Sequence, residues 1–410
     1  MTKKSILFVD DEPNILSGLK RMFRVLRQVT DYHFIESGPA ALDFMAEHHV
    51  DVIVSDMRMP GMDGAALLAI VQEKFPHIIR LMLTGQADEK SILQTVAVVH
   101  QFIAKPSTPE TLHGILDRTC ALQEVLQNDH LQSSIAKMGS LPSLPAVLAL
   151  LQRTLKRPEC SLDDIAAVIK QDLAISAKIL QLANSAFFGL YNDIVSLSRA
   201  VSILGVDTIK SLVRCEGVFT ELNPATVASS IAPSLWQHSM EVAVFAEKIT
   251  QMENDAKELA ETAFLAGFMH DIGKLVFFSS VQEQYLPTLE LVKSRKIPPD
   301  QAEQQLFNAT HGQVGGYLLG LWGLPLPVVE IVLFHHHPEQ HPTPSFLPAV
   351  AVHAADVIYY RLHPDSHFGE PILNGALLKQ AGMADRFDHW LTSCGEIVME
   401  SPPVPDQQKY

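Results

Sequence analysis

Short apolar runs alternate with amphipathic stretches over the first quarter of the chain. Each run is too short for a helix and lies between turn residues, so each predicts a buried β-strand. The stretches between them, such as residues 13–29 and 39–48, repeat apolar residues at helical spacing. Strands that alternate with helices form a parallel sheet covered on both faces. The pattern therefore predicts a doubly wound α/β domain with five parallel strands, at the runs 6–9, 34–35, 52–54, 79–83 and 102–104.

From Pro109 onward the apolar residues recur every three or four positions. The first of these helices is predicted to continue beyond the α/β domain to about residue 131 and to act as a connector. Such a helix either pairs with its copy in a homodimer or packs on its own domain, and the pattern leaves both alternatives open. A break rich in proline and glycine follows at residues 139–145, and only helical periodicity appears after it. The second half is therefore predicted to be all-α.

The length of 410 residues predicts two or three domains. We expect the boundaries to follow the changes in pattern described above. The α/β domain takes residues 1–122, a helical linker 123–138, the all-α domain 139–345, its helical extension 346–400 and a frayed tail 401–410.

Composition narrows the class of protein. The chain has 47% hydrophobic and 19% charged residues, which is typical of globular domains, and a net charge of −15. Neither half is basic, which argues against direct DNA binding. The four cysteines are scattered without paired spacing, as in reduced cytoplasmic proteins. No signal peptide and no apolar membrane span are recognisable, so we expect a cytoplasmic protein that does not enter membranes.

Polar side chains follow four of the predicted strands, at the edge of the sheet where ligands usually bind. Asp10 and Asp11 follow the first of these strands, Asp56 the next, then Thr84 and finally Lys105. Carboxylates gathered at one edge repel one another unless a hard cation such as Mg²⁺ shares them. A carboxylate also accepts phosphoryl groups as a nucleophile. We assign Asp56 as the phosphoacceptor, with Asp10 and Asp11 holding Mg²⁺ beside it, and Thr84 and Lys105 contacting the phosphoryl oxygens.

Residues 3–122 resemble the receiver domain of two-component response regulators. The resemblance rests on the acid pair, on Asp-Met-x-Met-Pro-Gly-Met-Asp-Gly from Asp56, on Thr84-Gly85 and on Lys105-Pro106. It implies a phosphorelay in which a sensor histidine kinase phosphorylates Asp56, with Asp10, Asp11 and Asp56 around the Mg²⁺. It also implies that Phe102, three residues before the lysine, moves together with Thr84. The alternative is a Rossmann-like domain with incidental acids.

Histidines and aspartates of the helical half have the residue types of a metal centre. Each lies in a helical pattern or at its end, so an all-α core can bring them together from several helices. Imidazole nitrogens with one or two carboxylates suit Fe, Mn or another divalent metal such as Zn or Ni. Such a metal generates hydroxide and polarises a phosphate, while Lys274 is placed to offset phosphate charge in a catalytic role. The candidate ligands are His238, His270, Asp271, His311, His335, His336 and Asp356.

The helical half resembles an HDOD domain, a module related to the HD phosphohydrolases, over about residues 136–340. The resemblance rests on Leu-Pro-Ser-Leu-Pro at 141–145, Gln-Asp-Leu-Ala at 171–174, Leu-Ala-Asn-Ser at 182–185 and Ala-Val-Ser-Ile-Leu-Gly at 200–205. HDOD domains generally resemble signalling modules that bind a protein output partner. This resemblance implies an interaction function for the helical half.

The order of the histidines and aspartates also resembles the ligand set of HD-GYP phosphodiesterases, which cleave cyclic di-GMP at a centre of two or three metals. The chain departs from that family after the paired histidines, where Pro-Glu-Gln-His replaces any Gly-Tyr-Pro motif. That motif belongs to the part that handles the cyclic dinucleotide. Two functions thus stay open for the helical half: an interaction module controlled by phosphorylation, or a metal-dependent phosphohydrolase acting on cyclic di-GMP or another phosphoester.

Overall fold

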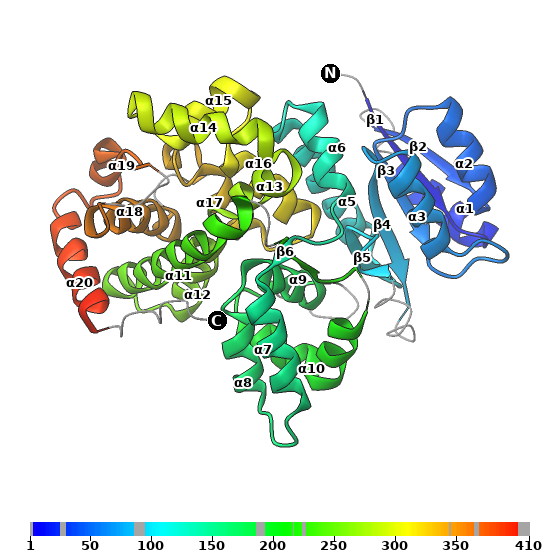
Figure 1. Cartoon of the computed structure of the whole chain (residues 1–410). Coiled ribbons are helices and arrows are strands. Elements are labelled where there is room, and N and C mark those ends of the chain that lie inside the picture. The colour runs from blue at the N-terminus through cyan, green and yellow to red at the C-terminus, as the bar shows by residue number, and fades with distance from the viewer. Residues whose placement is uncertain are drawn as a thin grey trace.

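The computed structural model describes residues 3–24, 30–85, 95–185, 193–215, 217–223, 227–343, 346–364 and 369–400. The predicted tail 401–410 lies outside them. The first domain is a five-stranded sheet in which all neighbours are parallel, in the order β2-β1-β3-β4-β5 (Figure 1). The predicted doubly wound α/β fold is confirmed. Its elements are β1 (Lys4–Val9), α1 (Pro13–Met22), β2 (Thr30–Ile35), α2 (Gly38–Glu47), β3 (Val52–Asp56), α3 (Gly64–Lys74), β4 (Ile79–Thr84), β5 (Gln101–Ala104) and α5 (Pro109–Val125).

The strands are buried because the sheet is covered on both faces. In β1, β3 and β4 almost every side chain is buried, which matches their continuous apolar runs. The edge strand β2 is only partly buried, and its sequence is correspondingly more polar. The carboxyl ends of β1, β3, β4 and β5 lie at one edge, and this arrangement gathers the polar residues that follow them.

The predicted connector helix is interrupted. Helix α5 ends at Val125, and α6 (Asp129–Lys137) begins after a short break. The side chain of Asn128 accepts a hydrogen bond of 3.0 Å from the backbone N–H of Leu131, and its own amide donates to the carbonyl of Phe307. Asn128 thus starts a new helix instead of continuing the old one. The prediction of one helix to residue 131 was wrong, because it ignored this capping residue.

The second domain is helical, as predicted, with one short pair of two-residue parallel strands that the sequence did not indicate. Its long helices α11, α12 and α18 pack side by side (Figure 1). The elements are β6 (Pro142–Ser143), α7 (Pro145–Lys156), α8 (Leu162–Ile169), α9 (Leu173–Ala183), α10 (Leu197–Arg214), β7 (Thr220–Glu221), α11 (Val227–Glu253), α12 (Lys257–Met269), α13 (Ile272–Ser280), α14 (Gln282–Arg295), α15 (Pro299–Phe307), α16 (His311–Leu321), α17 (Leu326–Phe334), η3 (Pro338–Gln340), α18 (Leu347–Leu362), α19 (Gly375–Gln380) and α20 (Phe387–Glu400).

The α/β domain docks on the helical domain through β5, α5 and the segment before β5 (Figure 1). Lys178 of α9 is fully buried and donates to the carbonyls of Val96, at 2.8 Å, and Gly139, at 2.6 Å. Gln101 of β5 donates in turn to the carbonyl of Gly320 at the end of α16, at 3.0 Å. These bonds join the two domains directly, so the connector helices α5 and α6 are not their sole link.

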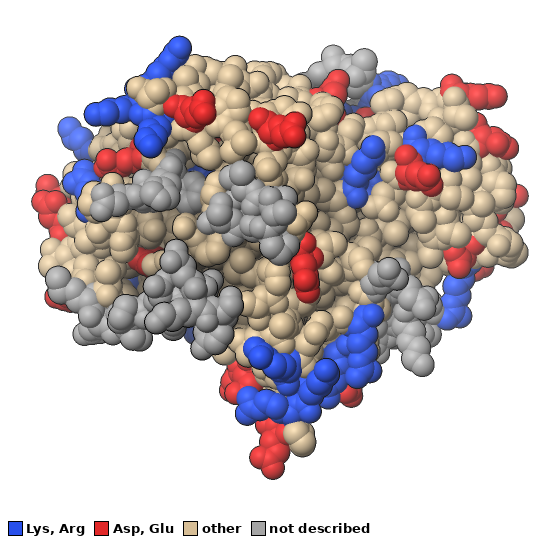
Figure 2. Space-filling model, in the orientation of Figure 1, with Lys and Arg blue, Asp and Glu red and all other residues tan. Residues whose placement is uncertain are grey.

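Charged side chains of both signs are interspersed over the outer surface. Figure 2 shows basic side chains gathered over the lobe that contains α7 and α10, with acidic ones beside them, at the tip of this lobe and elsewhere on the same face. Among the described residues, no helix combines the length and the apolar character that crossing a membrane requires.

The buried ammonium of Lys178 makes the stability of the protein depend on pH. Burial lowers the pKa of Lys178 to about 7 in the folded protein, from 10.5 in the unfolded chain. Between these values the unfolded state binds more protons, so folded stability rises with pH. We therefore expect the unfolding free energy of wild type to rise from pH 7 to 10 relative to that of Lys178→Met. The rise should be at most about 1.4 kcal/mol per pH unit. Urea unfolding of both proteins across this range measures the difference, and parallel stability curves would contradict the expectation.

Candidate phosphoacceptor and metal sites

The predicted phosphoacceptor lies in a cluster of charges at the carboxyl edge of the sheet. Asp56 is the last residue of β3, and Asp10 follows β1. The ammonium of Lys105, just after β5, lies 2.7 Å from Asp10 Oδ2 and 2.5 Å from Asp56 Oδ1. Burial opposes the charge on Lys105, but these two hydrogen bonds outweigh it and raise the pKa of the lysine. The three residues therefore form one ion-paired group.

The loop after Asp56 holds the carboxylate in place. The backbone N–H of Arg58 donates to Asp56 Oδ2 at 2.7 Å. Gly64 lies so close to the Asp56 carbonyl that a Cβ on it would be 2.1 Å from that oxygen, so this position requires glycine. Asp63 caps α3 by accepting a hydrogen bond from the N–H of Ala66 at 2.8 Å. The motif that the sequence singled out thus supports the Asp56 side chain structurally.

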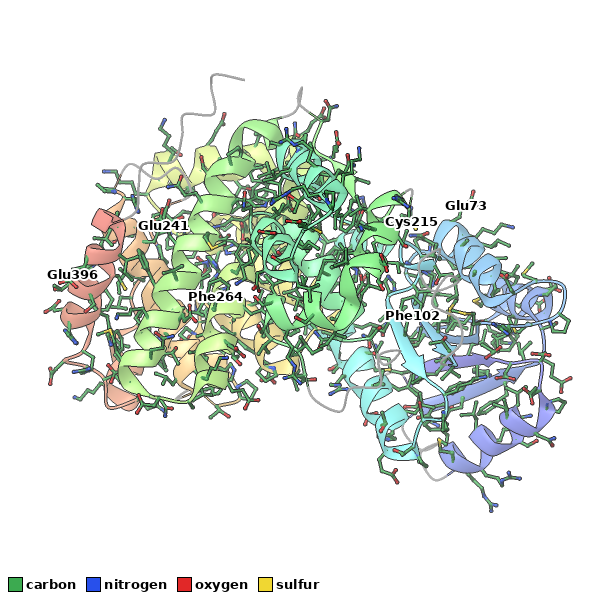
Figure 3. The ribbon with its side chains drawn as sticks, turned by 90° about the horizontal axis from the view of Figure 1, so that it is seen from below. Glu73, Phe102, Cys215, Glu241, Phe264 and Glu396 are labelled. Atoms are coloured by element: carbon green, nitrogen blue, oxygen red, sulfur yellow. The ribbon has the colours of Figure 1, made fainter. Side chains whose placement is uncertain are left out.

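The remaining predicted residues of this site line the same edge. Asp11 follows Asp10 and is partly exposed. Thr84 ends β4, is buried, and donates to the carbonyl of Gly85 at 3.2 Å. Phe102 is buried in β5, on the side of the α/β domain that faces the helical domain (Figure 3). Carboxylates at the ends of two neighbouring strands, β1 and β3, are a donor set that suits Mg²⁺.

The structure brings all seven candidate metal ligands together inside the helical domain. They come from α11, the α12–α13 junction, the start of α16, the end of α17 and the middle of α18. Their donor atoms form three overlapping groups, each with all atoms within 4.8 Å of one another. The groups are His311, His335 and His336; His238, His270 and Asp356; and His270, Asp271 and His335.

Three of these histidines are held in one tautomer. The Nδ1 of His270 donates to the carbonyl of Gly267 at 2.6 Å, and that of His335 donates to the carbonyl of Val332 at 2.7 Å. The Nδ1 of His311 donates to the carboxylate of Glu303 at 2.7 Å. Because Nδ1 is the donor in each ring, Nε2 faces the centre, where it either ligates a metal ion or carries a second proton.

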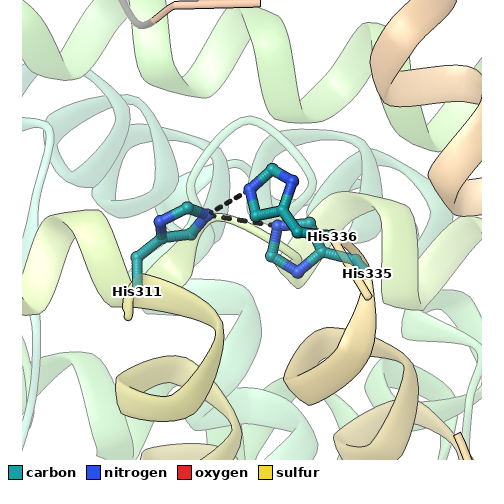
Figure 4. A group of neighbouring side chains, drawn as sticks. All are labelled: His311, His335 and His336. Atoms are coloured by element: carbon teal, nitrogen blue, oxygen red, sulfur yellow. Dashed lines mark hydrogen bonds between the residues drawn. The ribbon is translucent and has the colours of Figure 1, made fainter. Parts of the chain in front are cut away.

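The Nε2 atoms converge closely. His311 Nε2 lies 3.1 Å from that of His335 and 2.9 Å from that of His336 (Figure 4). Two lone pairs at this distance repel each other unless a cation lies between them. Burial and neighbouring rings keep the pKa of His335 and His336 well below the usual value. Burial opposes protonation of His311 too, but Glu303 raises the pKa of that ring to about 9. Either a proton on His311 or a metal ion can therefore remove the repulsion between the lone pairs.

Asp271 and Asp356 add negative charge on the other side of the centre. His238 Nε2 lies 3.2 Å from Asp271 Oδ2 and 3.4 Å from Asp356 Oδ1. Burial raises the pKa of Asp271, but Lys274 and the histidines lower it well below the usual value, so the carboxylate is charged. The donor set of imidazoles and carboxylates therefore fits a divalent transition metal such as Fe or Mn. His238 differs from the other rings in that its buried Nδ1 lacks a hydrogen-bond partner among the described residues.

Lys274 lies beside the candidate metal ligands, and its catalytic role stays a prediction. Its ammonium lies 2.7 Å from Asp271 Oδ2, and its side chain is 4% exposed. In this structure it balances the charge of Asp271. The neighbouring Gly273 allows α13 to approach the start of α16, because a Cβ there would lie 1.9 Å from the carbonyl of His311.

Sequence reasoning missed Glu303, which is fully buried in α15. One oxygen accepts from the N–H and the Nδ1 of His311, each at 2.7 Å, and the other accepts from the hydroxyl of Tyr285 at 2.6 Å. The local sequence, Asp-Gln-Ala-Glu-Gln-Gln, is that of a solvated helix. Its one signal is the apolar Ala302 beside Glu303 on the buried face of α15.

Known proteins match each domain separately. A model of the response regulator receiver domain matches residues 6–117, and a model of the HDOD domain matches residues 141–338. A protein named chemotaxis protein CheY-3 from Vibrio cholerae is 33% identical over 116 residues, which are 28% of this chain and 88% of that protein.

Two further proteins are similar to longer parts of the chain. An uncharacterized protein from Treponema pallidum is 28% identical over 229 residues, 54% of this chain and 44% of that protein, so the chain spans less than half of that relative. The crystal structure of the MmoQ response regulator from Methylococcus capsulatus covers 62% of this chain and 98% of its own, at 21% identity and a TM-score of 0.45. The chain belongs to the response regulators and joins an N-terminal receiver domain to a C-terminal HDOD domain.

Proposed function

We propose that Asp56 accepts a phosphoryl group from a sensor histidine kinase and that this charge controls the HDOD domain. The observation that carries the proposal is the group of Asp56, Asp10 and Lys105 at one strand edge. A carboxylate oxygen of Asp56 bonds to phosphorus while the phosphorus–nitrogen bond of the kinase phosphohistidine breaks. The electron pair stays on the imidazole nitrogen, which takes up a proton.

The neighbouring residues stabilise the transferred group. Asp10, Asp11 and Asp56 would hold Mg²⁺, which supplies positive charge against the phosphoryl oxygens. Lys105 already contacts Asp56 and supplies a second positive charge there. The Thr84 hydroxyl, which donates to the Gly85 carbonyl in this structure, is free to turn toward a phosphoryl oxygen because rotation about one bond suffices.

The contacts between the domains offer a path for the signal. Lys105 lies three residues beyond Phe102 and four beyond Gln101, whose amide bonds the carbonyl of Gly320. Gly320 lies in α16, the helix that begins with His311 at the metal centre. A change at the phosphoacceptor edge that shifts β5 therefore acts on a helix of the HDOD domain.

We propose that the HDOD domain is an interaction module with a metal-holding core, which passes the signal to a protein partner. The burial of the centre supports this function: His336 has the most exposed side chain of the seven, at 11%. A substrate as large as a cyclic dinucleotide needs an open position on the metal.

A metal-dependent phosphohydrolase is the second candidate function. The observation that favours it is the convergence of seven donors, because a metal held there activates water and polarises phosphate when bound. Under this function His336, at the exposed edge, faces the incoming phosphoester, and Lys274 keeps Asp271 charged.

The acceptor role of Asp56 can be tested by labelling. We expect wild type to gain one phosphoryl group per chain from acetyl phosphate with Mg²⁺, measured by intact mass, and Asp56→Asn to gain none. Asp63→Asn is the matched control, because Asp63 lies in the same loop but caps α3. Labelling of the Asp56→Asn protein at the wild-type level would contradict the proposal.

The metal-holding role can be tested through Glu303, which touches His311 and is not itself a candidate ligand. Glu303→Gln weakens the orientation of His311, so we expect divalent-metal affinity to fall by about 10-fold to 100-fold. Chelator competition after Fe or Mn loading of anaerobically purified protein measures this affinity. Glu247→Gln, a half-buried glutamate of α11, should leave it unchanged. Equal affinity in Glu303→Gln and wild type would argue against a metal at these residues.

The two functions of the HDOD domain differ in their response to the same double variant. We expect no hydrolysis of cyclic di-GMP by metal-loaded wild type. We also expect the double variant His270→Ala, Asp271→Ala to retain partner binding. Unchanged helical circular dichroism would show that this variant is folded. Hydrolysis by wild type that the double variant abolishes would favour the phosphohydrolase and reject the interaction module as the main function.

A further inference from the structure

The side chain of His100 is buried where the receiver domain, the linker helix α6 and the HDOD domain meet. His100 lies just before β5 and is 2% exposed. Its Nδ1 accepts a hydrogen bond of 3.0 Å from the backbone N–H of Arg80, and its Nε2 donates to the carbonyl of Ala136 in α6, also at 3.0 Å. A backbone N–H can only donate and a carbonyl can only accept. The ring is therefore neutral, and its one proton is on Nε2.

The charged groups closest to this ring are positive. Nη2 of Arg80 lies 3.0 Å from Nε2 and donates to the same carbonyl of Ala136. Lys178 of α9 is the second cation that acts on the ring. Tyr317 of α16 interacts with Arg80 and is neutral, because burial raises the pKa of its hydroxyl. Burial and the two cations hold the pKa of His100 well below 6.5. At longer range, a cavity between the domains that His100 lines carries charges of both signs, on Arg118, Asp193 and Glu330.

The segment that ends at His100 carries the contacts that dock the domains. The carbonyl of His100 accepts from Gln181 of α9 at 2.9 Å, and the carbonyl of Val96 accepts from the ammonium of Lys178 at 2.8 Å. A second proton on the ring would point at the N–H of Arg80, so the ring can take it up only by leaving its position. Such a movement displaces the carbonyls that the HDOD domain binds.

We propose that His100 is a pH-sensitive switch, in which a proton taken from solvent expels the ring and releases the receiver domain from the HDOD domain. The undocked ring is exposed and binds this proton near pH 6.5, whereas the docked ring stays neutral. Docking is therefore complete above pH 6.5 and weakens as the pH falls below it. Lys178 takes up its proton at higher pH, between about 7 and 10.5, so the two effects are separable. The switch does not depend on phosphorylation of Asp56, and the two proposals fail or succeed separately.

Single-molecule energy transfer between dyes on the two domains measures docking in the full chain. Glu73 of the receiver domain and Cys215 of the HDOD domain are suitable positions (Figure 3), with Glu73→Cys introduced and the other cysteines replaced by alanine. Low urea is chosen so that docked and undocked molecules are both present at pH 7.5. From pH 7.5 to 5 we expect the ratio of docked to undocked molecules to fall by about 30-fold, at up to about tenfold per pH unit.

Helical circular dichroism should stay constant over this range, because each domain remains folded. A constant ratio of docked to undocked molecules, or a fall that coincides with loss of helix, would overturn the proposal. NMR of ¹⁵N-labelled imidazole gives a second readout that needs no variant. At pH 7.5 it should show the His100 proton on Nε2, and a proton on Nδ1 would also overturn the proposal.

Variants separate the switch from general effects of acid. His100→Asn keeps an acceptor for the N–H of Arg80 but takes up no proton, so its docking should be independent of pH from 7.5 to 5. His100→Gln is a second variant with the same expectation. His77→Asn is the matched control, because His77 is a half-buried histidine of the same domain, has a pKa that burial also lowers, and stacks on His49. It should keep the 30-fold response. An acid response of wild-type size in a folded His100 variant would overturn the proposal.

Discussion

Two buried cations at the boundary between the domains fix how the domains fit together. Lys178 of the HDOD domain finds its acceptors in the receiver segment before β5 and in the linker. Arg80 of β4 is 1% exposed and donates to the carbonyl of Ala136 in α6 and to that of Val98. A desolvated cation without acceptors is very costly. The two residues are therefore satisfied only when receiver, linker and HDOD domain are docked in this arrangement, which places β5 against α16.

The candidate metal site is organised by a similar constraint. Buried imidazoles need partners for both nitrogens, and backbone carbonyls or Glu303 take up one nitrogen of His270, His311 and His335. The Nε2 atoms of these rings therefore face one another. A second proton on His311 or a bound cation relieves the repulsion between their lone pairs. The same hydrogen bonds that order the core therefore also orient the donors of the candidate metal site.

The sequence was most informative where functional side chains directly follow a β-strand. Asp10, Asp56, Thr84 and Lys105 follow apolar runs directly, so parallel-strand topology alone places them at one edge. The candidate ligands were found by residue type and order, yet Glu303 was not. Its role comes from contacts with side chains of two other helices, and no local pattern marks such contacts. The break before Asn128 was missed for a different reason, because apolar periodicity continued through a residue that caps a new helix.

Helix α16 runs from the candidate metal site to strand β5, and Lys105 of the phosphoacceptor group follows the other end of that strand. It begins at His311 among the metal donors and ends beside Gly320, which accepts from Gln101 of β5, while Trp322 just beyond it lies 5.3 Å from the ammonium of Lys178. Eleven residues of α-helix span about 16 Å, and such an element moves as a unit. A displacement of β5 therefore cannot be absorbed within α16 without moving the His311 end. The route from Asp56 to the histidine core thus runs through Lys105, β5 and the hydrogen bond of Gln101 to Gly320 before it reaches α16. The connector between the domains, in contrast, is interrupted before Asn128.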